Sequence, residues 1–183
     1  MQMNNRSFEK GFSLLLAFLM VIVVPMSLRA DDGDGNAEYW TAVGSTGSVD
    51  ESSLGQIGFY QGVAFNGGYG TATLRYNVTA TDDLFGGANT RFVVRYLDPG
   101  ACTRVEACLF QYNLNTGANT LLMTLNSDSF AQSSGFQTRF IDSPSLPAFN
   151  FNDNGYYVEV YLIDNCGFPS GNARIGLLRL NRF

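Results

Sequence analysis

The residues of this chain that are best suited to chemistry are carboxylates, and two of them stand inside predicted strands. Glu106 lies in the run 103–114 and Glu159 in the run 154–162. A pair of carboxyl groups flanking a glycosidic bond is sufficient for glycoside hydrolysis. In each run apolar residues occupy every second position, and the glutamate lies among the positions between them. Both glutamates are therefore expected to point away from the core. We interpret them as solvated charges on a sheet and keep a carboxylate-dependent glycoside hydrolase as the alternative function.

Other catalytic systems are excluded by composition. The chain has no histidine, and its one lysine is Lys10. Triads built on histidine, His-ligated zinc, Schiff-base chemistry and Ser-Lys pairs are therefore absent. Three cysteines cannot form a four-thiolate zinc site. The sequence thus predicts a protein that is not an enzyme.

Calcium is the one cofactor that the acidic residues are suited to hold. Seven aspartates stand at the ends of predicted strands, where they would either gather around Ca²⁺ or make ordinary turns: Asp82, Asp83, Asp98, Asp128, Asp142, Asp153 and Asp164. Asp32, Asp34 and Asn36 have the spacing that opens a calcium loop, but Ala37 and Val43 stand where such a loop needs glycine and glutamate. We favour turns and a solvated tail, and the metal ligands stay unknown.

Tyr157 and Tyr161 are the candidate binding residues. They share one parity of a predicted strand, away from its apolar face. Exposed tyrosines would suit stacking on a sugar or contact with a protein, because the ring offers a large rigid surface. Packing under a second sheet or a covering loop is the explanation we favour.

The charge balance argues against a nucleic-acid partner. After residue 30 the chain has eight basic residues, all arginine, against 15 acidic ones, a net charge of −7. The arginines do not cluster in the sequence, whereas binding to phosphates needs clustered positive charge.

Residues 1–30 resemble a cleaved signal peptide. Arg6 and Lys10 precede an uncharged apolar run from Phe12 to Val24, which is too short to span a bilayer. An uncleaved anchor is one alternative. A second is a prepilin, because residues 10–15 resemble a prepilin processing site, although Leu16 replaces the expected glutamate. We expect a secreted, periplasmic or cell-surface protein with no membrane contact after cleavage.

The elements that would position these residues are short strands. Residues 31–55 are polar and glycine-rich, which predicts a flexible N-terminal segment, and residues 56–183 form one β-domain. Period-two alternation marks eight or nine strands with no helix, which predicts a two-sheet antiparallel β-sandwich. Residues 90–125 read as three consecutive antiparallel strands joined by the Asp98-Pro99-Gly100 turn and a second turn at residues 115–119.

The three cysteines predict one disulfide. An exported chain meets oxidising conditions. Cys102 and Cys108 would lie about 20 Å apart in an extended strand, against a limit of about 7 Å for a disulfide. Cys102 and Cys166 both stand at strand ends, so we predict that they pair and that Cys108 is left as a free or intermolecular thiol.

The order of features resembles one group of proteins. A strand ending in Tyr96 to Gly100 is followed by the segments 109–117 and 154–160 and by a final Ile/Leu-rich strand. This resembles exported bacterial jelly-roll-like β-sandwich modules of uncharacterised function, from which the cysteines and the insertion 166–172 depart. The resemblance implies a jelly-roll-like fold and no site residue. We expect a secreted, non-catalytic module that binds a glycan or a protein or forms part of an extracellular structure, with a pilin-like subunit as a further alternative.

Overall fold

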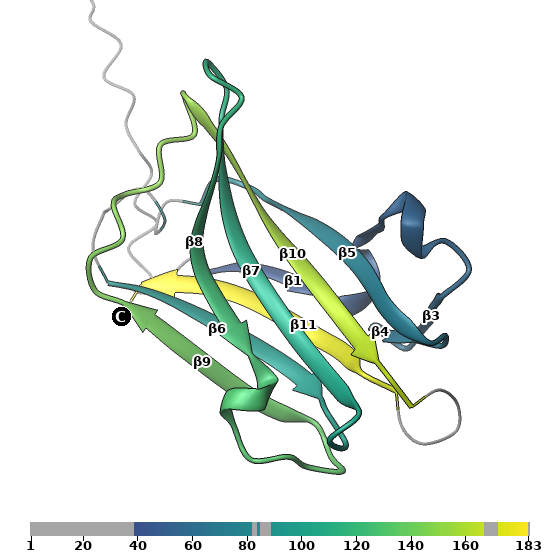
Figure 1. Cartoon of the computed structure of the whole chain (residues 1–183). Coiled ribbons are helices and arrows are strands. Elements are labelled where there is room, and N and C mark those ends of the chain that lie inside the picture. The colour runs from purple at the N-terminus through teal and green to yellow at the C-terminus, as the bar shows by residue number, and fades with distance from the viewer. Residues whose placement is uncertain (1–38, 82–83, 85–88, 167–171, 183) are drawn as a thin grey trace, which may run out of the picture. The chain divides into compact units, whose positions relative to one another are not determined.

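The computed structural model describes residues 39–81, 84, 89–166 and 172–182, and these form two packed antiparallel sheets (Figure 1). Residues 1–30, the predicted signal peptide, lie outside the described part. Sheet A has the order β3 (Ile57–Tyr60), β4 (Val63–Asn66), β11 (Arg174–Arg182), β6 (Thr90–Leu97) and β9 (Gln137–Ser143), and β1 (Trp40–Val43) also pairs with β11. Sheet B has the order β2 (Ser48–Val49), β5 (Gly70–Val78), β10 (Asn154–Asp164), β7 (Thr103–Asn113) and β8 (Asn119–Asn126).

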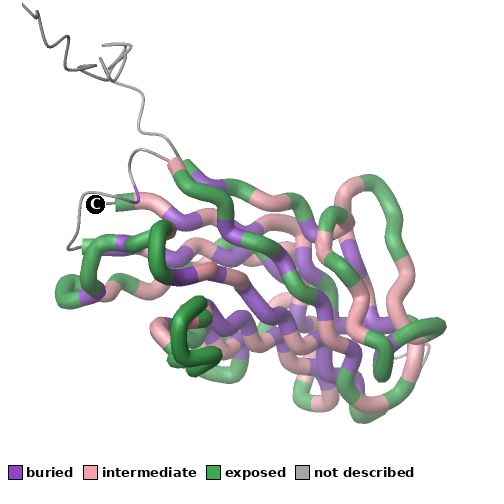
Figure 2. Tube along the Cα trace, turned by 90° about the horizontal axis from the view of Figure 1, so that it is seen from above, coloured by how far each residue is buried: buried purple, intermediate pink, exposed green. Residues whose placement is uncertain are grey.

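The predicted fold class is confirmed: the described residues form an all-β sandwich of two antiparallel sheets. Its helices are single 3-10 turns, η1 (Gly44–Thr46), η2 (Glu51–Ser53) and η4 (Ser127–Ser129). No helix in the described part is long and apolar enough to cross a membrane. Buried residues alternate with more exposed ones along the long strands, most clearly in β5 and β6, and Figure 2 shows this change along the chain. Phe92, Val94 and Tyr96 of β6 meet Val158, Val160 and Leu162 of β10 in one continuous core.

Two late strands hold the sandwich together. In sheet B, β10 pairs along its length with β5 on one side and β7 on the other. In sheet A, β11 pairs with β6 on one side, while β4 and β1 share its other side. Ala173 to Leu180 contributes buried side chains on both parities because the register shifts between Ile175 and Leu177.

The prediction of three consecutive antiparallel strands over residues 90–125 is wrong in its first pairing. Strands β7 and β8 do pair, but β6 belongs to sheet A and β7 to sheet B. The connection therefore crosses from one sheet to the other. Asp98 stabilises this crossing: its side chain is 1% exposed and accepts hydrogen bonds from Thr103 Oγ1 at 2.7 Å and from Ser127 Oγ at 2.6 Å. The same Asp-Pro-Gly sequence that suits a hairpin thus forms a corner, and β6 pairs with β11 and β9 while β7 pairs with β10 and β8.

Within the predicted N-terminal segment 31–55, the described part from Trp40 onward forms β1, β2 and the 3-10 turns η1 and η2. Trp40 is 5% exposed in the core, and Val49 of β2 packs against that core. The sequence offered too few apolar residues here for a periodicity signal, so strands of four and two residues were not expected. They are one reason why the described residues form eleven strands rather than eight or nine.

Residues 57–66 form a tight hairpin. β3 and β4 pair from Ile57 with Asn66 to Tyr60 with Val63. Gln61 and Gly62, the two residues between the strands, both have positive φ, at 48° and 83°. Positive φ at both central positions is the backbone of the two-residue turn that matches strand twist.

The cysteines behave as expected. Cys102 and Cys166 form a disulfide, and their Cα atoms lie 5.4 Å apart. Cys108 is free and buried on the outer side of sheet B, where Glu106 and Thr124 surround its thiol. Burial raises the pKa of the Cys108 thiol, so it is protonated and shielded.

Candidate functional site

A groove runs over the outer face of sheet A, and we call it the sheet A groove. Its first lobe has a volume of about 640 Å³ and lies over β3, β4 and the start of β11. Six of the residues that border this lobe are Tyr60, Val63, Phe65, Phe136, Asn172 and Arg174. A second lobe of about 340 Å³ shares Gln61, Val63 and Phe136 with the first and extends to Val43, Arg95 and Leu177. The volume of the first lobe is in the range of ligand-binding clefts.

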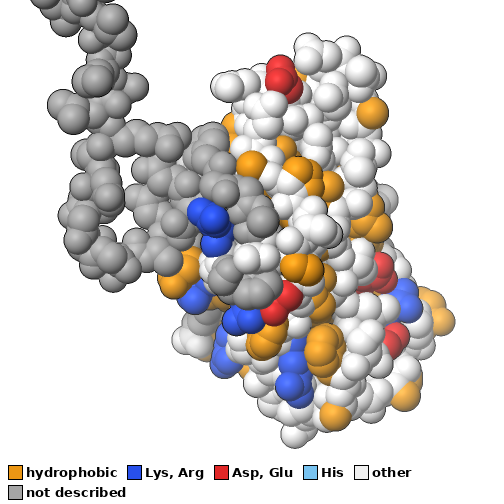
Figure 3. Space-filling model, turned by 90° about the vertical axis from the view of Figure 1, so that its left-hand side faces the viewer, with side chains coloured by type: hydrophobic (Ala, Val, Ile, Leu, Met, Phe, Trp, Pro, Cys, Tyr) orange, Lys and Arg blue, Asp and Glu red, His pale blue; other side chains and the backbone are white. Residues whose placement is uncertain are grey.

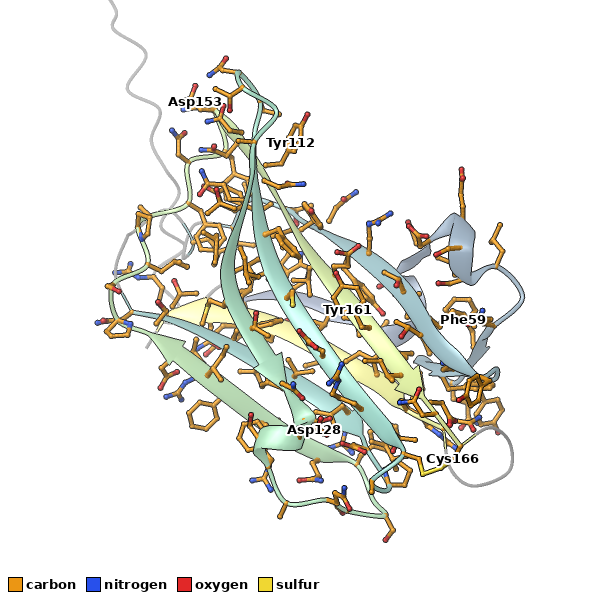
Figure 4. The ribbon with its side chains drawn as sticks, in the orientation of Figure 1. Phe59, Tyr112, Asp128, Asp153, Tyr161 and Cys166 are labelled. Atoms are coloured by element: carbon orange, nitrogen blue, oxygen red, sulfur yellow. A yellow bond between two sulfur atoms is a disulfide. The ribbon has the colours of Figure 1, made fainter. Side chains whose placement is uncertain are left out.

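Aromatic rings form the floor and walls of this groove. Tyr60 is 67% exposed, and Phe59 borders the groove from the β3 edge, on the right of Figure 4. The Phe65 ring lies over Gly58 on the neighbouring strand, since a Cβ at Gly58 would collide with that ring. The Phe136 ring lies close to Gly176, where a Cβ would come within 3.3 Å of the ring. Glycines in β3 and β11 thus let two rings lie down on the sheet where a side chain would push them away.

Two arginines stand beside these rings. The guanidinium carbon of Arg174 lies 6.0 Å from the centre of the Phe65 ring, and that of Arg95 lies 5.2 Å from the centre of the Phe136 ring. Both side chains are exposed, and both border the groove. The groove therefore combines apolar rings, the amides of Gln61 and Asn172, and two cationic groups.

The structure places Tyr157 and Tyr161 on the outer face of sheet B, away from this groove. Tyr157 stacks on Phe110 of the adjacent strand, with ring centres 5.2 Å apart. Tyr161 donates a hydrogen bond of 2.6 Å to Glu159, and burial together with this bond raises the pKa of Tyr161. Both rings are half-buried by neighbours in their own sheet. A binding role for Tyr157 and Tyr161 stays a prediction.

Glu106 and Glu159 lie on neighbouring strands and share the outer face of sheet B, because Glu159 pairs with Cys108 and Tyr161 with Glu106. Glu159 is only 9% exposed. Arg75 contacts its Oε1 at 2.8 Å, while Tyr161 occupies its Oε2. Arg75 also reaches Asp50 at 2.6 Å. Both oxygens of Glu159 are thus engaged within the sheet, whereas glycoside hydrolysis needs both carboxyl groups open to the substrate.

The aspartates of the predicted calcium cluster are spread over the molecule. Figure 4 shows Asp153 and Asp128 at opposite ends of the sandwich. Asp142 pairs with Arg91, Asp98 is buried at the corner, and Asp82 and Asp83 lie outside the described residues. Within the described ranges no group of three or more Cys, Asp or Glu side chains is placed to hold a metal ion. Calcium binding stays a prediction.

Reasoning from sequence missed the sheet A groove. Its residues come from four separate segments, at 59–65, 95, 136 and 172–177, and no one segment contains a motif. The signal that was present is the occurrence of aromatic residues and arginines at outward positions, which the fold brings together as Phe65 with Arg174 and Phe136 with Arg95. It is visible only once the strand order places those segments side by side.

The comparisons find a likeness to solved structures only. No family model matches the chain, and no curated protein matches it. The C-terminal CBM6 of LamC, a laminarinase from Zobellia galactanivorans, has 10% sequence identity and a TM-score of 0.48, over 79% of this chain and 100% of that one. A CBM36-1 domain of a xylanase from the hindgut metagenome of Trinervitermes trinervoides has 12% identity and a TM-score of 0.45, over 80% and 98%.

A domain of tailspike protein 4 from bacteriophage CBA120 is a third similar structure, with 9% identity and a TM-score of 0.44, over 81% of this chain and 20% of that one. Identities and TM-scores this low carry no argument about ligand or activity.

Proposed function

We propose that this protein is an exported, non-catalytic β-sandwich module that binds a glycan in the sheet A groove. The observation that carries the proposal is the set of rings, Tyr60, Phe65 and Phe136, bordering one cleft of about 640 Å³ beside the amides of Gln61 and Asn172. One face of a sugar ring presents C–H groups and its rim presents hydroxyls. A flat aromatic surface flanked by polar groups suits both parts of such a ligand.

Export is supported by two features of the chain. Residues 1–30 have the charge and length pattern of a signal peptide, and a disulfide between Cys102 and Cys166 is a bond that persists in oxidising compartments. A non-catalytic role is supported by the absence of histidine and by the engagement of Glu159 with Arg75 and Tyr161.

A glycan array probed with the protein, with and without a calcium chelator, is the first test. We expect binding that the chelator does not abolish, because the groove supplies its contacts without a metal. Tyr60→Ala and Phe136→Ala should each weaken binding about fivefold, since an aromatic contact contributes roughly 1 kcal/mol. Tyr112→Ala is the matched control, because Tyr112 is an exposed tyrosine on sheet B.

Three results would contradict the proposal. Binding to no glycan would favour the protein-binding or structural roles. Binding that Tyr112→Ala reduces as much as Tyr60→Ala would move the site off sheet A. Binding that disappears in chelator would restore the calcium-dependent site that the aspartates suggested.

A further inference from the structure

We propose that the sheet A groove selects anionic glycans, that is, sugar chains carrying carboxylate or sulfate groups. The inference rests on the proposed function and adds the class of ligand. It starts from the charges of the two sheets. The strands of sheet A contain six arginines and one acidic residue, Asp142, whereas those of sheet B contain two arginines and three acidic residues.

The arginines of sheet A are concentrated on its outer face. Arg91 and Arg95 alternate along β6 with the buried residues Phe92, Val94 and Tyr96, so they point outward. Arg179 and Arg174 of β11 pair across the sheet with Val93 and Leu97, which share that outward parity. Figure 3, which looks at the side of the molecule where β9 lies, shows basic side chains gathered among hydrophobic ones. A chain with a net charge of −5 thus carries a basic face.

Arg95 and Arg174 differ from the arginines that serve the fold. Arg75, Arg91 and Arg104 all form ion pairs with Asp or Glu, at 2.6 to 3.8 Å. Neither Arg95 nor Arg174 forms an ion pair with a described residue, and no Asp or Glu of the described chain lines either lobe. Their neighbours are instead the rings of Phe136 and Phe65, and Thr138, to which Arg95 donates a bond of 3.4 Å.

This arrangement suits a carboxylate or a sulfate that projects from a stacked sugar. A guanidinium group offers a planar fork of donors that matches such an anion with two parallel hydrogen bonds. The ring beside each guanidinium restricts the orientations of the arginine side chain, so less freedom is lost when the anion binds. Two cations without acidic neighbours would also attract a polyanion from a distance of about one Debye length, roughly 8–10 Å at physiological salt.

A matched set of polysaccharides tests the inference. Titration calorimetry would compare polygalacturonate with its fully methyl-esterified form, and dextran sulfate with dextran. We expect at least one charged polymer to bind about tenfold more tightly than its uncharged match, since a charge-assisted hydrogen bond adds about 1.5 kcal/mol or more. The polymer that binds then identifies the anionic group as carboxylate or sulfate.

Variants assign the effect to the groove. Arg95→Gln and Arg174→Gln should each weaken binding of the charged polymer about tenfold and leave the uncharged one unchanged. Arg104→Gln on sheet B, where the side chain is 40% exposed, is the matched control and should have no effect. All three side chains lie at the surface, and circular dichroism would verify that each variant keeps the wild-type melting temperature.

The outcomes separate the two proposals. Equal binding of charged and uncharged polymers, still weakened by Tyr60→Ala, would overturn the anionic preference and leave glycan binding intact. No binding to any polymer or arrayed glycan would overturn both. Tighter binding of oligo(dT) than of any glycan would replace the glycan by a single-stranded nucleic acid. A dimer that dissociates in Phe136→Ala would replace it by a second copy of this chain.

Discussion

The side chains that contact the Glu159 carboxylate come from its own sheet. Arg75 and Tyr161 hold its two oxygens, and Cys108 is its partner across the strand pair. Arg75 in turn joins it to Asp50. The charge is therefore part of the packing of the sheet B surface, and replacing it should be felt first as a loss of stability.

Glu159→Gln should lower the free energy of unfolding by about 1–2 kcal/mol, because Arg75 loses its buried anionic partner. Urea denaturation would measure the change, with Glu106→Gln as the control. Glu106 faces Arg104 at 3.8 Å in a more exposed setting, so its replacement should cost less than about 0.5 kcal/mol. If the wild type hydrolyses a glycan and Glu159→Gln abolishes that hydrolysis, the protein is an enzyme.

Asp142 gives the fold a predictable response to acid. Arg91 donates two hydrogen bonds to its carboxylate, at 2.7 and 2.8 Å, and these lower the pKa of Asp142 below its ordinary value of 3.8. A lowered pKa in the folded state means that the pair stabilises the protein above about pH 4 and that this contribution is lost as the pH falls through the folded pKa. The coupling between Arg91→Gln and Asp142→Asn in a double-mutant cycle should therefore be present at pH 7 and smaller at pH 3. A coupling that is unchanged at pH 3 would contradict this assignment.

At the scale of the elements, the disulfide closes the end of the sandwich where β6 crosses to β7. Cys102 lies in that crossing and Cys166 follows β10, and Asn165 N donates a hydrogen bond of 2.8 Å to Cys102 O. The two cysteines are 64 residues apart. Closure of so long a loop restricts the unfolded chain far more than the folded one.

Cys166→Ser should lower the free energy of unfolding by about 4 kcal/mol. The matched control is the wild type in dithiothreitol, which should lose the same amount, while the variant should be unaffected by the reductant. Peptide mapping without reduction would give one linked pair, Cys102 with Cys166. A linked pair that includes Cys108 would contradict the structure, because that thiol is buried between Glu106 and Thr124.

The elements also show what sequence reasoning can supply. Alternation located the long strands well, since residues such as Phe92, Val94 and Tyr96 have their side chains on one face whichever partner the strand takes. Alternation does not encode partner choice, so β6 and β7 were assigned to one sheet. Trp40 and Val49 were missed because strands of four and two residues are too short for a period-two pattern.

The groove was beyond prediction for the same reason. Tyr60, Arg95, Phe136 and Arg174 are each ordinary surface residues of a strand or loop, and only the order of strands in sheet A gathers them. The disulfide could be predicted from the sequence. The extended geometry of a strand excludes the pair Cys102–Cys108, and the position of Cys102 and Cys166 at strand ends favours their pairing.

At the scale of the whole molecule, the order of strands governs when the protein can fold. The central strand of sheet B is β10, and β11 joins β1, β4 and β6 in sheet A. Both come near the end of the chain, so the early strands β1, β4, β5 and β6 have no partner in the middle of their sheet until residues 154–182 have been made. Contacts of such high sequence separation make folding slow.

A nascent chain of this protein should thus stay unfolded during most of its synthesis. A version that stops at residue 173, without β11, should be digested by protease at low urea and should show a red-shifted Trp40 fluorescence, whereas the full chain resists. Ribosome-bound chains that end at residue 173 or 183, each followed by a linker that spans the ribosome exit tunnel, should show the same difference in protease resistance. Under the export proposed above, a machinery that threads unfolded polypeptides would meet an unfolded chain until β11 has been made, and β11 would then set the moment at which the sandwich folds.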